Sequence, residues 1–252
     1  MHSGMKSLLV STLAILAIAS PASAGGLQFK RTEVGFAAHS YFFGGGTVSS
    51  THYKLKTAID LPGNSLELEG RLGVDSLFGP VLYQGHLTLG ASVSPNTKLG
   101  LSVGQIGFTG GTPINQIAVS GMHQFGNGAF LDLSVGQLTV TGSTPLNFAV
   151  VKYSQGNWFV NVTNMAIFGA NIGSASIGYT HNLGPAAISA SVGAVYSSTG
   201  GPSIGQVAVE LKIPFGQESS VSTKKSSQGT DGVENRSFED FNYAESVFGG
   251  AV

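Results

Sequence analysis

The chain has 252 residues, of which only 10% are charged, with a formal net charge of -1 and 37 glycines. Soluble proteins usually carry about 25% charged residues and about 7% glycine, so this composition does not suit a protein surrounded by water. The nearly neutral charge gives no electrostatic basis for binding nucleic acid, and the absence of cysteine excludes disulfides and thiolate metal sites.

The first 24 residues have the pattern of a cleavable export signal. Lys6 precedes an apolar stretch at 8–19, and the small residues Ala-Ser-Ala at 22–24 provide a cleavage site. The apolar stretch is too short for a transmembrane anchor, and a polar segment follows it. We therefore expect residues 1–24 to be a signal peptide and the mature chain to use the general secretory route.

Residues 25–215 consist of short segments in which apolar and polar positions alternate, separated by turn-type clusters. In the segment 81–93, for example, Val81, Tyr83, Leu87 and Leu89 share one face, and the intervening residues are mostly polar. The clusters separate twelve segments of about 10 to 13 residues, which is the length of a tilted strand in an outer-membrane wall. The pattern predicts an all-β fold, a transmembrane antiparallel up-and-down β-barrel of about 12 strands with short loops on both sides. An even strand number places both termini in the periplasm.

A repeat of hairpin size supports this count. Residues 101–106 (LSVGQI) recur as 133–138 (LSVGQL), and each copy continues into a glycine-rich turn that ends in Thr-Pro. The apolar positions change phase inside each copy, from Val103 to Ile106 and from Val135 to Leu138. We interpret this change as a β-bulge that keeps both members of each pair on the lipid face. A β-solenoid or a soluble sandwich would also alternate, but neither requires so few charges.

With these features the chain resembles bacterial outer-membrane β-barrel proteins of the porin type over roughly residues 31–215. Its last predicted strand is similar to the assembly signal of that class, with alternating apolar residues and a final aromatic residue: Val209, Leu211, Ile213 and Phe215. The resemblance implies a location in the outer membrane of a Gram-negative bacterium, contact with outer-membrane lipid and folding by the barrel-assembly machinery.

Alternation also assigns side chains to the lumen. Charged residues and histidines of the first three strands and the last strand would form one charged wall: Arg31, Glu33, His39, His52, Lys54, Lys56, Glu67, Glu69, Arg71, Glu210 and Lys212. This wall would face Ser, Thr, Asn, Gln and Gly on the other strands. Because it mixes both signs, it could orient polar solutes without strongly selecting a charge, or it could form ion pairs that fill a narrow lumen.

Residues 216–252 differ in composition from the predicted strands: the segment is first rich in serine and then acidic and aromatic at 238–243. Such a segment cannot bury enough apolar surface to fold alone, so we expect a polar, disordered periplasmic tail. The alternatives are a plug of the lumen and a peptide that docks a periplasmic partner.

These observations favour a passive channel for small polar solutes, with no enzymatic activity, no cofactor and no metal site. One alternative is a structural or secretion-associated barrel whose tail binds a partner. A minor alternative is an outer-membrane lipid hydrolase, for which His39 and Ser40 are the only adjacent pair of suitable residues.

Overall fold

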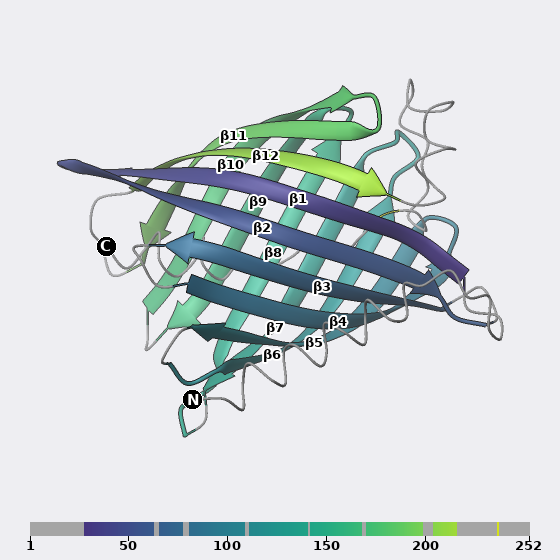
Figure 1. Cartoon of the computed structure of the whole chain (residues 1–252), viewed down its shortest axis with the longest axis horizontal. Helices are drawn as coiled ribbons and strands as arrows, with labels where there is room; N and C mark the ends of the chain where they lie inside the picture. The colour runs from purple at the N-terminus through teal and green to yellow at the C-terminus, as the bar shows by residue number, and fades with distance from the viewer. Residues whose placement is uncertain are drawn as a thin grey trace.

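In a computed structural model the chain forms a closed barrel of twelve antiparallel strands, as the sequence predicted (Figure 1). The structure describes residues 28–62, 66–77, 81–108, 111–140, 142–167, 170–198, 204–215 and 236. Neighbouring strands pair in chain order, and their bounds are β1 Gln28–Phe43, β2 Gly46–Asp60, β3 Leu66–Leu77, β4 Val81–Ser94, β5 Thr97–Phe108, β6 Ile114–Gln124, β7 Phe130–Val140, β8 Leu146–Gln155, β9 Trp158–Ile167, β10 Ala170–Leu183, β11 Ala186–Ser197 and β12 Ile204–Phe215. Within the described ranges, no helix has the length and hydropathy needed to span a bilayer.

The first and last strands close the barrel. Pairing of β1 with β12 runs without interruption from Thr32 opposite Phe215 to Phe42 opposite Gly205, and Figure 1 shows the two strands side by side. The sheet therefore has no free edge, which is what a β-structure needs inside a bilayer, where no water can satisfy unpaired backbone groups. We call the end where β1 begins and β12 ends the terminal end, and the other the distal end.

The two faces of the wall differ sharply in polarity. None of the Lys, Arg, Asp and Glu residues in the described strands is exposed; all are buried or half-buried on the inner side. The outer face carries large apolar side chains that are open to the surroundings, such as Val119 and Val192, each 56% exposed. This is the reverse of a soluble protein and matches a wall whose outer face contacts hydrocarbon.

Short hairpin turns join the strands at both ends. Gly128, Gly156 and Gly184 at the terminal end and Gly142 at the distal end have φ between 57° and 84°, a left-handed conformation that favours glycine. The turns at the terminal end, including Pro95 and Asn96, leave only a few residues between strands.

The interpretation of the phase change as a bulge was wrong. Pairing between β5 and β6 continues in register from Thr97 opposite His123 to Ile106 opposite Ile114, with no inserted residue. Strict alternation therefore sends Val103 outward, where it is 51% exposed, and Ile106 inward, where it is 0% exposed. The second copy behaves in the same way, with Val135 outside and Leu138 inside.

Residues such as Ile106 leave the lipid face because they pack with one another inside the distal end. Two clusters lie there. One contains Leu82, Ile106, Ile114, Ala118, Leu138, Phe148, Val150 and Met165, with Val140 and Leu146 packed against them, and the other contains Tyr41, Val195 and Ile204, with Phe43 and Ile172. We call the two clusters together the apolar collar. Among the described residues, every strand except β2 and β3 contributes to it. The collar gives the barrel a small hydrophobic core of its own at the distal end.

The opposite facing of Val135 and Leu138 is testable because the chain contains no natural cysteine. In liposomes, a lipid-soluble thiol reagent should label Val135→Cys strongly and leave Leu138→Cys nearly unlabelled, because only the first side chain meets hydrocarbon. Val103→Cys and Ile106→Cys provide a second pair with the same expected contrast. Equal labelling of the two variants within each pair would show that both side chains face lipid and that a β-bulge is present.

Candidate functional site: the lumen

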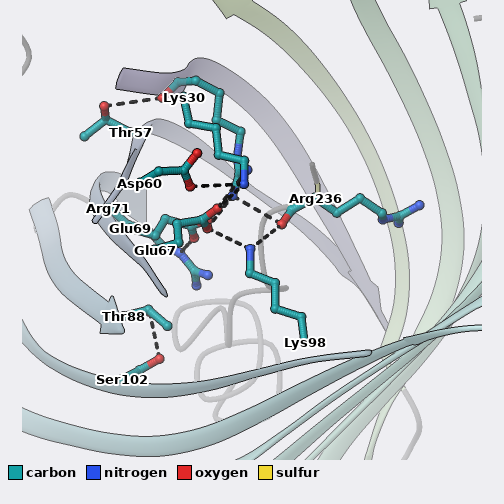
Figure 2. Close-up of polar contacts among 11 residues, drawn as sticks. Lys30, Thr57, Asp60, Glu67, Glu69, Arg71, Thr88, Lys98, Ser102 and Arg236 are labelled. Atoms are coloured by element: carbon teal, nitrogen blue, oxygen red, sulfur yellow. Dashed lines mark hydrogen bonds and ion pairs between the residues drawn. The ribbon is translucent and has the colours of Figure 1, made fainter. Parts of the chain in front are cut away.

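The terminal half of the lumen contains an ion network built from β1, β2, β3 and β5. It consists of Lys30, Arg31, Asp60, Glu67, Glu69, Arg71 and Lys98 (Figure 2). Glu67 accepts from Lys98 at 2.7 Å, from Arg31 at 2.9 Å and lies 3.0 Å from Lys30. Glu67 is thus shared by three cations, which offsets the cost of removing these charges from water.

Glu69 is the most enclosed carboxylate of the network. It is 1% exposed and accepts hydrogen bonds from the Nη2 of Arg31, at 2.8 Å, and from the Nε of Arg71. Strict alternation places Glu67, Glu69 and Arg71 on one face of β3, so a single strand contributes three adjacent members.

One residue from beyond the last strand, Arg236, lies inside this half of the lumen. Its backbone carbonyl accepts hydrogen bonds from Arg31 at 3.2 Å and from Lys98 at 3.0 Å. Figure 2 shows its side chain pointing away from the ion network, and its guanidinium lies 3.9 Å from the centre of the Phe130 ring on β7. Arg236 therefore bridges two walls of the lumen, whereas the other residues predicted to form the tail lie outside the described residues.

A second charged group joins β2 to β12 across β1. Lys54 forms an ion pair with Glu210, which is also 3.3 Å from Lys212. The intervening inward position on β1 is Gly35, where an added Cβ would lie 2.4 Å from the Lys54 side chain. Glycine at this position lets the lysine cross a whole strand to reach its partner.

Polar groups interrupt the apolar collar on β2 and β3. His52 Nδ1 and Asp75 Oδ1 are 2.5 Å apart, and both side chains are buried. In register they lie beside Leu82, so they stand at the level of the collar. His39 of β1 is buried nearby and stacks on Tyr41, with ring centroids 6.4 Å apart. A polar strip therefore runs past the collar on this side.

The open part of the lumen lies on the side of β8 to β12. A cavity of about 340 Å³ extends from the turns at residues 156–157 toward His39 and His52. Polar side chains that carry no charge form much of its lining: Gln84, Ser154, Asn157, Asn161, Ser176, Thr180, Asn182, Ser189 and Ser191. Charged lining residues, by contrast, are Lys54, Lys152, Glu210, Lys212 and Arg236.

Cross-strand hydroxyl pairs complete the inner wall. Thr88 with Ser102, Ser120 with Ser134, and Thr163 with Ser174 have oxygen atoms 2.7 to 2.9 Å apart. These pairs satisfy buried hydroxyls without water and without large side chains, so they keep the wall polar yet thin.

The residues assigned to the charged wall all lie on the inner side of the barrel, buried or half-buried. They do not form one surface. Arg31, Glu67, Glu69 and Arg71 belong to the ion network, whereas Lys54, Glu210 and Lys212 belong to the cavity. In the register of β2 and β3, Lys56 faces Arg71 and Glu67 faces Asp60.

Six residues belong to the site but were not among the residues predicted for it: Lys30, Asp60, Asp75, Lys98, Lys152 and Arg236. Lys98 and Lys152 are isolated charges within otherwise uncharged strands, and a charge that must avoid lipid has to point inward, so this signal was available. A plug of the lumen was one alternative for residues 216–252, but it was based on the acidic and aromatic stretch at 238–243 and not on Arg236.

His39 and Ser40 cannot act as a catalytic pair. His39 points into the lumen and is 7% exposed, whereas Ser40 lies on the outer side and pairs with Ser49 at 3.1 Å between hydroxyls. Consecutive residues of a strand face opposite sides of the wall, so the imidazole cannot reach the hydroxyl. Across the described parts of the barrel, no group of three metal-ligating side chains is found.

Comparison with known proteins gives a fold and no family. No protein-family model and no curated protein sequence matches the chain. The COG4313 outer-membrane channel of Pseudomonas putida F1 has a TM-score of 0.55 and 12% identity, covering 78% of this chain and 99% of that one. The KdgM porin has a TM-score of 0.51 and 7% identity, covering 73% and 99%. The chain thus has the fold of outer-membrane β-barrel proteins of the porin type.

We expect the ion network to stabilise the barrel through its most enclosed member. Replacing Glu69→Gln leaves Arg71 and Arg31 buried with one carboxylate fewer, and the free energy of unfolding in detergent micelles should fall by about 3 kcal/mol. The control Asp60→Asn removes a partly open partner of Lys30 at the rim, where the loss should stay below about 1 kcal/mol. Urea titration followed by tryptophan fluorescence measures both, and equal small losses would show that the network is not structural.

Proposed function

We propose that the protein is an outer-membrane channel of a Gram-negative bacterium that passes small polar solutes passively through its lumen. The observation that carries the proposal is the cavity of about 340 Å³, whose uncharged lining is mainly hydroxyl and amide groups. Twelve strands stand between eight-stranded barrels filled by side chains and sixteen-stranded porins with aqueous channels, so a partly open lumen is the expected result. The absence of a workable nucleophile and base at His39 and Ser40 argues against lipid hydrolysis.

The orientation in the membrane follows from the even strand number. Both ends of the barrel sequence lie at the terminal end, which we propose faces the periplasm, and the signal peptide at 1–24 delivers the chain there. The alternating apolar residues of β12, Val209, Leu211, Ile213 and Phe215, would serve as the assembly signal read by the barrel-assembly machinery. The cavity then opens toward the periplasm at the turns near residue 156.

The route from the cavity to the outside passes the apolar collar on its polar side. His39, Ser50, His52 and Gln206 are inward and buried at this level, and they offer hydrogen bonds beside the apolar side chains of the collar. A solute that keeps hydrogen bonds while it crosses avoids the cost of burying unpaired polar groups. The collar would therefore be the constriction of the channel, and small polar molecules would cross it along β1 to β3 and β12.

A bulky residue in the cavity should close the channel, and a matched change on the lipid face should not. Ser191 lines the cavity, and Ala190, its neighbour in β11, is exposed on the outer face. In planar bilayers, Ser191→Trp should reduce the single-channel current by about half or more, because an indole fills much of a cavity of this size. Ala190→Trp should conduct like the parent protein; equal currents from both variants would place the conducting path elsewhere.

The tail offers a separate test, because Arg236 occupies part of the terminal mouth. A chain that stops after Gly216 should still fold, since β1 and β12 are fully paired up to Phe215 opposite Thr32. It should also carry a larger current, because removal of Arg236 widens the mouth. The single variant Arg236→Ala should give part of this rise. Unchanged currents in both variants would favour a tail that serves a periplasmic partner, and failure to fold would show that the tail belongs to the barrel.

A further inference from the structure

We propose that the cavity binds a small polar solute that carries an oxyanion, either a carboxylate or a phosphate, and that Lys152 and Lys212 are the groups that contact it. This inference rests on the proposed channel function and adds the charge class of the solute. It departs from the expectation that the mixed charges of the lumen would select no sign.

The charged groups that reach the cavity are mostly cations. Lys54, Lys152, Lys212 and Arg236 line it, and Glu210 is the one carboxylate among the described lining residues. Glu210 serves two lysines at once, forming an ion pair with Lys54 and lying 3.3 Å from Lys212. Four cations thus stand against one carboxylate among the described charged residues that line the cavity.

The other two cations lie against aromatic rings. The Lys152 ammonium is 4.8 Å from the centre of the Phe159 ring, and the Arg236 guanidinium is 3.9 Å from that of Phe130. An aromatic ring attracts a cation and holds it in place, but it does not neutralise the cation because the ring carries no net charge. Both groups can therefore contribute to attracting an anion.

The carboxylates that balance these cations are set back in the wall. Asp132 faces Lys152 in register and Asp75 bonds His52, but neither lines the cavity, and each is at most 3% exposed. Glu33 faces Lys56 across β1 and β2, outside the cavity lining, so these two charges of opposite sign largely cancel. The buried carboxylates reduce the strength of the field, yet an incoming solute meets the ammonium groups first.

The uncharged lining suits the remainder of such a solute. Ser176, Thr180, Ser189 and Ser191 present hydroxyls along β10 and β11, and hydroxyls both donate and accept hydrogen bonds. A hydroxylated body can bind this side while its oxyanion reaches Lys152 and Lys212. A volume of about 340 Å³ is at the lower end of the range for small-molecule sites, so the solute should be small.

Ion selectivity of the full-length protein in planar bilayers tests the inference. Under a tenfold gradient of KCl, the permeability ratio of chloride to potassium should exceed about 3, since fixed charge in a narrow lumen concentrates the opposite ion. The double variant Lys152→Gln/Lys212→Gln should bring the ratio to about 1 or below, because Glu210 and Asp132, which loses its partner Lys152, then balance Lys54 and Arg236. The matched variant Lys152→Arg/Lys212→Arg keeps both charges and should keep the ratio.

Inorganic phosphate then probes the oxyanion itself. Millimolar phosphate should reduce the chloride current of the parent protein and of the double arginine variant, and should leave the double glutamine variant unaffected. If the glutamine variant fails to fold, Glu210→Gln gives the opposite test, with a ratio raised about twofold. An unselective or cation-selective parent current would overturn this inference alone, as would a phosphate effect that survives loss of both lysines. No current from a folded, heat-modifiable protein would overturn the channel function and this inference together.

Discussion

Closure of the sheet between β1 and β12 is the constraint on which the rest of the structure depends. In a bilayer every backbone N–H and C=O must find a partner in the protein, and only a closed sheet provides one for each strand. Closure with continuous pairing also fixes which way each side chain points. Once Thr32 pairs with Phe215, the register of the two strands determines whether each of their residues faces the lipid or the lumen. The register shifts in the described pairings lie near strand ends, between Phe29 and Arg31 in β1 and between Ser92 and Ser94 in β4.

The electrostatics of the lumen follow from this fixed orientation of the side chains. Charge on the lipid face costs about 2 to 4 kcal/mol for Lys or Arg at midplane, so every charged residue of the wall turns inward. A lumen of twelve strands is narrow, and the charges must then satisfy one another. Glu67 shared among Lys30, Arg31 and Lys98 is one solution, and Lys54 crossing over Gly35 to Glu210 is another. Both solutions join strands that are not neighbours, so the ion pairs also brace the barrel from within.

Much of this could be predicted from sequence, because the governing rule is local. The strand number, the closed topology and the inward facing of residues such as Lys54 follow from period-two alternation and turn residues alone. The phase change at Ile106 was misread for a physical reason. The prediction assumed that an apolar residue of the wall faces lipid. Inside the distal end, however, Ile106 packs against other apolar residues of the collar. Hydrophobicity does not distinguish these two environments.

The division of the charged residues into an ion network and a cavity could not be predicted, because it depends on contacts across the lumen. Sequence patterns fix which side of the wall a residue faces, and they say nothing of which strand its side chain will reach. The entry of Arg236 into the lumen belongs to the same class of contact, since Arg31, Lys98 and Phe130 come from three different strands.

Side-chain size decides where the lumen stays open. The inward positions of β10, β11 and β12 near mid-height are small, among them Ser176, Ser189, Ser191 and Ala208. On the opposite wall Arg71, His86 and Gln116 carry long side chains that lie over small residues such as Ser120 and Ser134, and the space that remains there is about 20 Å³. The cavity is therefore displaced toward β8 to β12 rather than centred on the barrel axis. This displacement brings it against Lys152, Glu210 and Lys212, whereas Glu67 and Glu69 remain sealed among their partners on the other side. The sign of the charge that a solute meets is thus set by the distribution of small residues as much as by the distribution of charged ones.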